Sequence, residues 1–172
     1  IVATLARTFF PLDARFLDYG GGYGLFVRMM RDRGFDFYRQ DVHCENIFAD
    51  QFDLTDLPAG SKFDLVTAIE VFEHLQDPVA DLDQMLRLSD TILFTTELQP
   101  DNAAALGDWH YFVPETGQHI SLYHRESLAA LARRSGLHLL SHKDIHLLSR
   151  VPRSAFLYGL IFRPRFQKMM RK

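Results

Sequence analysis

Short apolar runs alternate with amphipathic segments along the first hundred residues of the chain. Short apolar runs are typical of buried strands, whereas apolar positions three and four apart are typical of helices. The predicted elements are, in order, strand 15–19, helix 23–33, strands 35–41 and 63–69, helix 78–88 and strand 90–96. Strands that alternate with helices predict an α/β fold, a doubly wound parallel sheet that binds ligands at the carboxyl ends of its strands.

The pattern changes beyond residue 97. A long segment over 98–123 has no clear period, and an amphipathic stretch over 125–135 then predicts a helix closed by Gly136. Two later apolar runs, 137–140 and 155–162, are interpreted as the last strands.

Composition indicates one globular domain, since 47% of the 172 residues are apolar and 24% are charged. We expect this domain to span 1–162, with a basic tail over 163–172. A net charge of −3 argues against a general nucleic-acid-binding protein, and one cysteine excludes a disulfide framework. With no membrane-length apolar run or signal peptide, a cytoplasmic enzyme is expected. Because the chain starts at Ile1 and soon enters a strand, we expect a fragment that has lost an N-terminal helix.

Charge is unevenly distributed. Residues 1–149 hold 12 of the 19 basic residues and all 22 acidic residues. The remaining basic residues are Arg150, Arg153, Arg163, Arg165, Lys168, Arg171 and Lys172. Such a segment is either a solvated extension or a weak contact for an anionic partner or a membrane surface.

The candidate ligand site begins where strand 15–19 ends. The residues from 16 onward read F-L-D-Y-G-G-G-Y-G, so that Asp18 precedes four glycines, Gly20, Gly21, Gly22 and Gly24. Glycine tolerates positive φ and carries no Cβ, so a ligand can lie directly on this backbone. The helix start beyond the loop offers unpaired N–H groups. The pattern therefore predicts a nucleotide-type site.

The glycine spacing narrows the ligand class. A dinucleotide site needs G-x-G-x-x-G, but Leu25 stands where its third glycine would be. No Gly-Lys-Ser/Thr sequence follows, which argues against a Walker loop. The carboxylate of Asp18 would repel a pyrophosphate but suits a ligand that carries positive charge.

Two motifs together resemble the class I S-adenosylmethionine (SAM)-dependent methyltransferases, in particular the small-molecule branch with the ubiquinone-pathway O-methyltransferases. The first is the acid followed by G-x-G-x-G, and the second is F-D-L-V…E-V-F-E-H-L…D-P over 63–78. The resemblance covers about residues 15–140. It implies a Rossmann-like, mostly parallel sheet of seven strands with helices on both faces, with SAM as methyl donor and S-adenosylhomocysteine as product.

Further cofactor contacts are expected after the second strand. Asp41 lies 21 residues beyond Gly20, and an acid at about this distance accepts hydrogen bonds from ribose hydroxyls. Val42, the next residue in the chain, is also expected to contact the cofactor. The alternative is that Asp41 only caps a helix predicted over 44–50.

The resemblance implies five more cofactor contacts. Asp53 would read the adenine amino group while Phe52 packs against the ring, although the two residues could equally form an ordinary turn. Ile69, Glu70 and Val71, at the end of strand 63–69, would line the cofactor site.

The acceptor side is expected in the aromatic segment 98–123, because long irregular loops in compact domains are usually lids or binding loops. Its aromatic side chains could exclude water from the donor methyl group, or they could simply close the end of the sheet. His119 is the first candidate for a general base and His110 the second, since imidazole titrates near neutral pH. His74 could face the acceptor or brace the loop.

A metal site is the alternative for Glu70-x-x-Glu73-His74. Some methyltransferases with this phrase, such as small-RNA 2′-O-methyltransferases, bind a divalent ion there. A further histidine would be needed, and the candidates are His110, His119 and His124. Because Glu70 commonly lies near SAM in metal-free relatives, we expect no resident metal.

The favoured reaction is methyl transfer to an oxygen or carbon of a small molecule. Enzymes that methylate exocyclic or amide nitrogens carry N/D-P-P-Y/F after the fourth strand, where this chain has Ile69-Glu70-Val71-Phe72. The alternative is a non-catalytic SAM-fold module or partner subunit of a larger biosynthetic protein. A dehydrogenase is disfavoured by the missing third glycine. The oligomeric state is left open.

Overall fold

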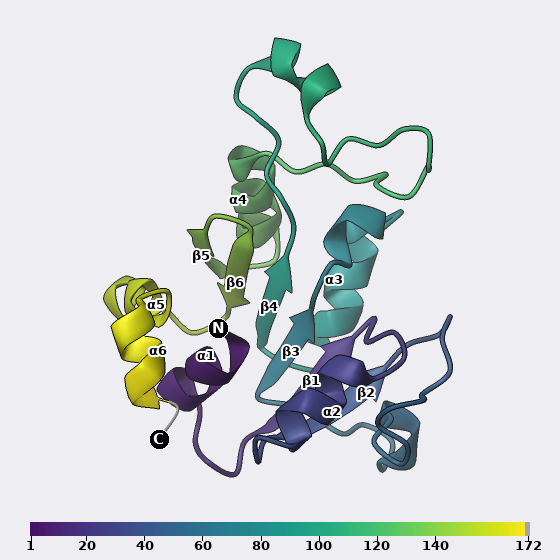
Figure 1. Ribbon diagram of the computed structural model, residues 1–172, viewed down its shortest axis with the longest axis vertical. Helices are drawn as coiled ribbons and strands as arrows, with labels where there is room; N and C mark the ends of the chain where they lie inside the picture. The colour runs from purple at the N-terminus through teal and green to yellow at the C-terminus, as the bar shows by residue number, and fades with distance from the viewer. Residues whose placement is uncertain (171–172) are drawn as a thin grey trace.

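The computed structural model describes residues 1–170, which form a six-stranded sheet (Figure 1). The strands are β1 Arg15–Tyr19, β2 Asp36–Gln40, β3 Leu65–Ala68, β4 Thr91–Thr95, β5 His138–His142 and β6 Ile145–Ser149. Their order is β2-β1-β3-β4-β6-β5, with the first four parallel and β6 antiparallel to both neighbours. The mostly parallel, doubly wound α/β fold predicted from the sequence is confirmed.

The expectation of seven strands was wrong. Beyond β2 the chain forms only an isolated parallel bridge between Arg39 and Asp53, and it turns at once into a short 3₁₀ helix, η1 Leu54–Asp56. Asp53 caps this helix in a capping box with Asp56, so the backbone groups that would extend a strand are engaged in a turn.

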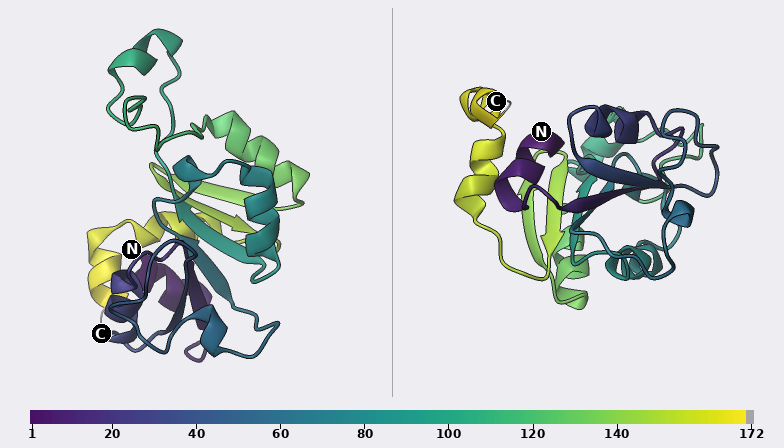
Figure 2. Two further views of the ribbon diagram at one scale, coloured as in Figure 1. Left: turned by 90° about the vertical axis from the view of Figure 1, so that its right-hand side faces the viewer. Right: turned by 90° about the horizontal axis from the view of Figure 1, so that it is seen from below.

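Helices cover both faces of the sheet (Figure 2). They are α1 Val2–Phe9, α2 Leu25–Arg31, α3 Pro78–Leu86, α4 Arg125–Arg134, α5 Ala155–Ile161 and α6 Pro164–Met170. Successive strand residues point to opposite faces. Phe16 therefore packs in the core beneath α1, α2 and α5, whereas Leu17 packs in the core with α3 and α4. None of these helices is long and apolar enough to cross a membrane.

The predicted strand over 155–162 is instead helix α5. The last strand is β6. A tight turn, in which Lys143 has a φ of 54°, connects β5 to it. Ser154 caps α5 by accepting a hydrogen bond from the Leu157 N–H at 3.3 Å, and Tyr158 and Ile161, three residues apart, are buried. A short apolar run does not distinguish a strand from a buried helix by its pattern alone.

Two other segments differ from expectation. The predicted helix over 44–50 is irregular, because the Asn46 side chain bonds both the N–H and the carbonyl of Ala49 and forms a local turn. The expected basic tail is helical over Pro164–Met170; Arg171 and Lys172 lie outside the described residues.

The segment between β4 and α4 projects beyond the carboxyl end of the sheet (Figure 1). It holds one 3₁₀ helix, η3 Ala103–Asp108, and its base is closed by a bridge between Leu98 and Tyr123. It returns to a short 3₁₀ helix that follows β3, η2 Phe72–His74: the Ile120 and Ser121 N–H groups both donate to the Glu73 carbonyl. The segment therefore reaches the site that forms at the strand ends.

Candidate functional site

The glycine loop after β1 folds tightly against its neighbours. The Gly20 N–H donates to the Gln40 carbonyl at 2.8 Å, and Gly20 and Gly24 have φ of 68° and 86°. A Cβ at Gly20 would lie 2.8 Å from Cγ2 of Val71, and one at Gly24 would lie 2.5 Å from an Asn46 oxygen. Both positions therefore need glycine for conformation and for space.

Asp41 lies directly after β2 and holds this loop. One carboxylate oxygen accepts a hydrogen bond from the Gly22 N–H at 2.9 Å, and the other accepts from the His43 and Cys44 N–H groups at 2.7 and 2.9 Å. Burial alone would raise the pKa of Asp41, but these three bonds and the Arg39 charge outweigh it and lower the pKa. Because a carboxylate has about four acceptor positions, an ionised Asp41 retains one for a ligand hydroxyl.

A cavity of about 490 Å³ lies at the carboxyl ends of β1, β2 and β3. The strand order reverses between β1 and β3, which is where ligands bind in doubly wound sheets. The lining includes Gly20, Asp41, Val42, Glu70 and Val71 of the expected cofactor residues. The other lining residues are Tyr19, Gln40, His43, His74, Leu75, Asp81 and Gln84. The structure thus brings five predicted residues from three strand ends into one cavity.

Some predicted residues support the loop rather than line this cavity. Gly21 donates its N–H to the Gln40 carbonyl at 3.2 Å, and a Cβ on it would lie 2.9 Å from a carboxylate oxygen of Asp18. Gly22 is held through Asp41, and Ile69 is half-buried after β3. Gly21 and Gly22 therefore help to fix the shape of the loop on which a ligand would rest.

Asp18 lies beneath the loop at the end of β1. Its side chain is 3% exposed and accepts a hydrogen bond from the Thr67 hydroxyl at 2.6 Å. Burial raises the pKa of this carboxyl to about 7. The interpretation of Asp18 as a direct partner for a positive ligand therefore has no support in the cavity lining.

We expect Asp18 to make stability fall as pH rises from about 4 to about 7, because the folded protein keeps a proton there that the unfolded chain, with a pKa near 3.8, releases. The linked loss is at most about 4 kcal/mol and is complete above pH 7. Urea unfolding across this range should show the fall in wild type and in Asp13→Asn, and a flatter profile in Asp18→Asn. An unchanged profile in Asp18→Asn would contradict this assignment.

Phe52 and Asp53 each contact an arginine side chain. The Asp53 carboxylate pairs with the Arg39 guanidinium at 2.8 Å, and the Arg31 guanidinium lies 3.4 Å from the centre of the Phe52 ring. Neither residue is among those that line the cavity.

Arg39 is a residue that the sequence reasoning missed. It is 2% exposed, and it donates to the carbonyls of Gly22 and Cys44 as well as to Asp53. It therefore ties the glycine loop, the segment after Asp41 and the turn at Asp53 together. The periodicity of the strand could have identified this residue. Arg39 stands two residues after the buried Phe37 and therefore faces the same side of the sheet, where an arginine needs partners for its charge.

Glu70 lies between the first cavity and a second one. Its φ of 53° is rare for a non-glycine residue. The Thr95 hydroxyl stabilises this backbone conformation, because it accepts a hydrogen bond from the Glu70 N–H at 2.8 Å and donates one to the Glu70 carboxylate at 2.6 Å. The second cavity, of about 560 Å³, is lined by Glu70, Glu97, Leu98, Tyr111, Arg125, Lys143 and Asp144. Ligands bound in the two cavities would therefore both contact Glu70.

Two histidines converge on Glu73 beside these cavities. The His74 Nδ1 lies 2.8 Å from the Gln118 carbonyl, and the His119 Nδ1 lies 2.7 Å from the Tyr111 carbonyl. Such bonds orient the rings and leave Nε2 free as a base or ligand. One nitrogen from each ring and one carboxylate oxygen of Glu73 lie within 4.8 Å of one another. These three residues could therefore hold a divalent ion or share a proton.

Glu73 has the most unusual environment in this cluster. Its side chain is fully buried, and neither carboxylate oxygen has a hydrogen-bond partner among the described residues. Burial raises its pKa. A buried carboxyl without a hydrogen bond favours a nearby proton donor or cation, and the His74 Nε2 lies 3.8 Å from one of its oxygens.

The other two histidines considered from the sequence lie elsewhere. His110 has a 79% exposed side chain and contacts Glu97 at 3.1 Å, at the rim of the second cavity. His124 caps α4 and contacts the exposed Asp101. Of the predicted base candidates, only His119 belongs to the cluster around Glu73.

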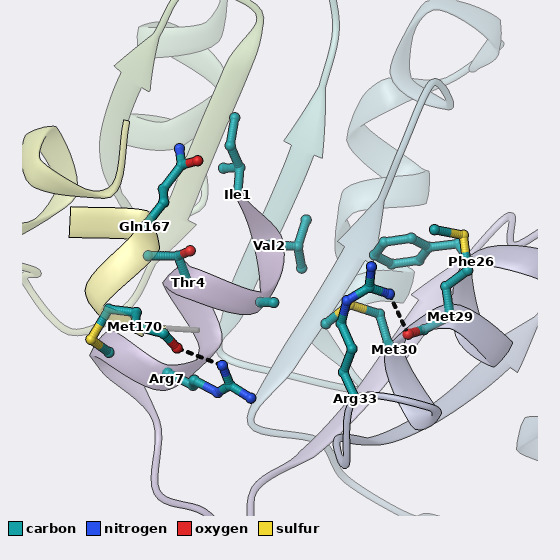
Figure 3. A pocket seen from close by; sticks show the side chains of 11 residues that line it. Ile1, Val2, Thr4, Arg7, Phe26, Met29, Met30, Arg33, Gln167 and Met170 are labelled. Carbon is teal, nitrogen blue, oxygen red and sulfur yellow. Dashed lines mark hydrogen bonds between the residues drawn. The ribbon is translucent and has the colours of Figure 1, made fainter. Parts of the chain in front are cut away.

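A larger hollow lies elsewhere, between α1, α2 and α6 (Figure 3). It measures about 760 Å³ and is lined mainly by apolar side chains such as Phe26, Met29 and Met30. Arg7 and Arg33 donate to the carbonyls of Met170 and Met29. Its lining contains no carboxylate and no histidine, so size alone does not identify the site.

Comparisons with known proteins identify the family of the chain. A family model described as a methyltransferase domain matches residues 1–142. Magnesium protoporphyrin IX methyltransferase from Synechocystis PCC 6803, solved with S-adenosylhomocysteine, is 15% identical, with 87% of this chain and 80% of that chain covered and a TM-score of 0.63. A putative methyltransferase from Haloferax volcanii, solved with the activator Trm112, is 16% identical, with 87% and 88% covered and a TM-score of 0.65.

A third structure is an O-methyltransferase from neocarzinostatin biosynthesis, solved with SAM and 2-hydroxy-5-methyl naphthoic acid. It is 13% identical, with 84% of this chain and 50% of that chain covered and a TM-score of 0.56. No curated protein matches the chain.

Proposed function

Because the chain belongs to the family of methyltransferase domains, we propose that it transfers a methyl group from SAM to an oxygen, or alternatively a carbon, of a small-molecule acceptor. The observation that carries this proposal is the cavity in which the glycine loop, the ionised Asp41 and Val71 meet at the strand switch point. Asp41 would accept a hydrogen bond from a ribose hydroxyl of SAM, and the loop would lie against its uncharged adenosyl part.

The second cavity supports an acceptor site. It shares Glu70 with the cofactor cavity, so a methyl donor in one and an acceptor in the other can be aligned. The acceptor oxygen would attack the methyl carbon in line, forming a C–O bond as the C–S bond breaks and S-adenosylhomocysteine leaves. His119 would take the hydroxyl proton, and the buried Glu73 nearby would stabilise the imidazolium. A cytoplasmic location is part of this proposal.

Asp41→Ala tests the cofactor half of the proposal. We expect about 10- to 100-fold weaker SAM binding, because one charge-assisted hydrogen bond to a ribose hydroxyl is worth about 1.5–3 kcal/mol. Calorimetric titration of SAM into folded protein measures the change. The matched control is Glu45→Ala, which removes an exposed carboxylate from the same loop and should bind SAM as wild type does. Equal affinity in all three proteins would contradict the assignment.

The proposed reaction needs no metal, because displacement at a sulfonium requires alignment and, at most, a base. We therefore expect chelation with EDTA to leave the rate of methyl transfer unchanged. A rate that falls on chelation and returns with Mg²⁺ or Mn²⁺ would instead assign Glu73, His74 and His119 to a divalent ion.

A further inference from the structure

Helix α5 is apolar on both of its sides. Tyr158 and Ile161 face the core, and the Tyr158 hydroxyl donates to the Ile145 carbonyl at 2.8 Å. Ala155, Phe156, Gly159 and Leu160 lie on the opposite side, as their helical spacing requires, and Phe156 is 75% exposed. A helix that is apolar all round is normally buried on all sides, so the outer side of α5 lacks a partner among the described residues.

The outer side of α5 is part of a shallow hollow of about 590 Å³. The hollow is lined by His142, Ala155, Phe156, Gly159, Leu160, Phe162, Arg163 and Pro164. His142 and Phe162 stack with ring centres 3.9 Å apart, so packed side chains form part of the lining. Figure 2 places α5 and α6 outside α1, as the outermost layer on that side of the molecule.

Basic residues continue this surface onto α6. Arg163 precedes α6, and Arg165 and Lys168 lie on its exposed side together with Met169, which is 60% exposed. Among residues 1–170, no ion pair involves Arg163, Arg165 or Lys168. The sequence from 150 onward contains no acidic residue. Exposed apolar side chains of α5 and exposed basic side chains at Arg163 and on α6 therefore lie on two adjoining helices, in a segment that contains no acidic residue.

We propose that this outer face of α5 and α6 binds an anionic lipid bilayer. Apolar side chains flanked by lysine and arginine are the pattern that interfacial helices use: the apolar groups enter the headgroup region and the cations contact lipid phosphates. Charge complementarity favours this occupant, because an anionic bilayer supplies both an apolar layer and dense negative charge. The cofactor and acceptor cavities contain no residue of α5 or α6, so the proposed surface is distinct from both.

The test is sedimentation with vesicles made of equal parts of phosphatidylcholine and phosphatidylglycerol, without SAM. Wild type should bind these vesicles and not pure phosphatidylcholine. Because each basic residue at an anionic surface strengthens binding about five-fold, the double variant Arg163→Gln, Lys168→Gln should bind about 25-fold more weakly. Phe156→Ser should bind about ten-fold more weakly, through lost apolar burial.

Two matched variants serve as controls. Arg133→Gln, Arg134→Gln removes the same charge from exposed positions on α4, and Ile47→Ser removes an exposed apolar side chain near β2; both should bind as wild type does. The proposal is wrong if wild type does not bind anionic vesicles, or if controls and test variants lose binding equally. It is also wrong if wild type self-associates through this face, seen as a dimer that Phe156→Ser converts to monomer.

Discussion

Replacing His119 by alanine should lower kcat for methyl transfer about 100-fold or more while leaving SAM affinity unchanged, because a positioned general base contributes about 10²–10⁴-fold. The Tyr111 carbonyl fixes the ring through Nδ1, and the buried Glu73 lies beside it. A ring held in this way can accept a proton at Nε2, and the carboxylate can stabilise the resulting charge. The rate is measured with methyl-labelled SAM and the first hydroxylated acceptor that wild type modifies.

His110→Ala is the matched control for this prediction. His110 is exposed and contacts Glu97 at the rim of the second cavity, so its loss should change kcat by less than about three-fold, as expected for a group that transfers no proton. If the two variants lose activity equally, or if His119→Ala keeps full activity with intact SAM binding, His119 is not the base.

Arg39→Met should lower the free energy of unfolding by about 2–4 kcal/mol, because it leaves the half-buried Asp53 carboxylate and two carbonyls without their donor. The matched control is Arg150→Met. Arg150 pairs with Asp90 at the same distance, 2.8 Å, but both side chains are largely exposed, so the loss there should be under about 1 kcal/mol. Urea unfolding measures both values.

The same variant also tests the role given to Arg39 in the site. Because Arg39 holds the Gly22 carbonyl and the segment after Asp41, Arg39→Met should weaken SAM binding even at temperatures where it is fully folded. Similar unfolding losses for Arg39→Met and Arg150→Met would show that burial of this ion pair does not govern the stability of the loop.

The first half of the fold could be predicted because its signals are local. The glycines after β1 and the proline that follows Asp77 mark element boundaries within a few residues, and alternating strands and helices define the sheet type. Segment 155–162 could not be assigned in the same way, because its apolar run fits a strand or a helix. Only the capping by Ser154 and the position of β6 decide between them.

Contacts between distant residues were hardest to predict. The adenine-reading role of Asp53 stays a prediction, and its pairing with Arg39 could not be predicted because it depends on how the segment after β2 folds back. His119 and Glu73 meet because the segment after β4 returns to η2 through hydrogen bonds of Ile120 and Ser121. No spacing in the sequence encodes that return, whereas Asp41 follows its strand directly and its position is fixed by the local fold.

The most direct test of the central claim is a crystal structure of the protein with S-adenosylhomocysteine. The ligand should lie in the cavity at the ends of β1, β2 and β3, with a ribose hydroxyl within hydrogen-bonding distance of Asp41 and its sulfur directed toward Glu70 and the second cavity. Ligand density in the apolar hollow between α1, α2 and α6, or a ribose that does not contact Asp41, would contradict the proposed function.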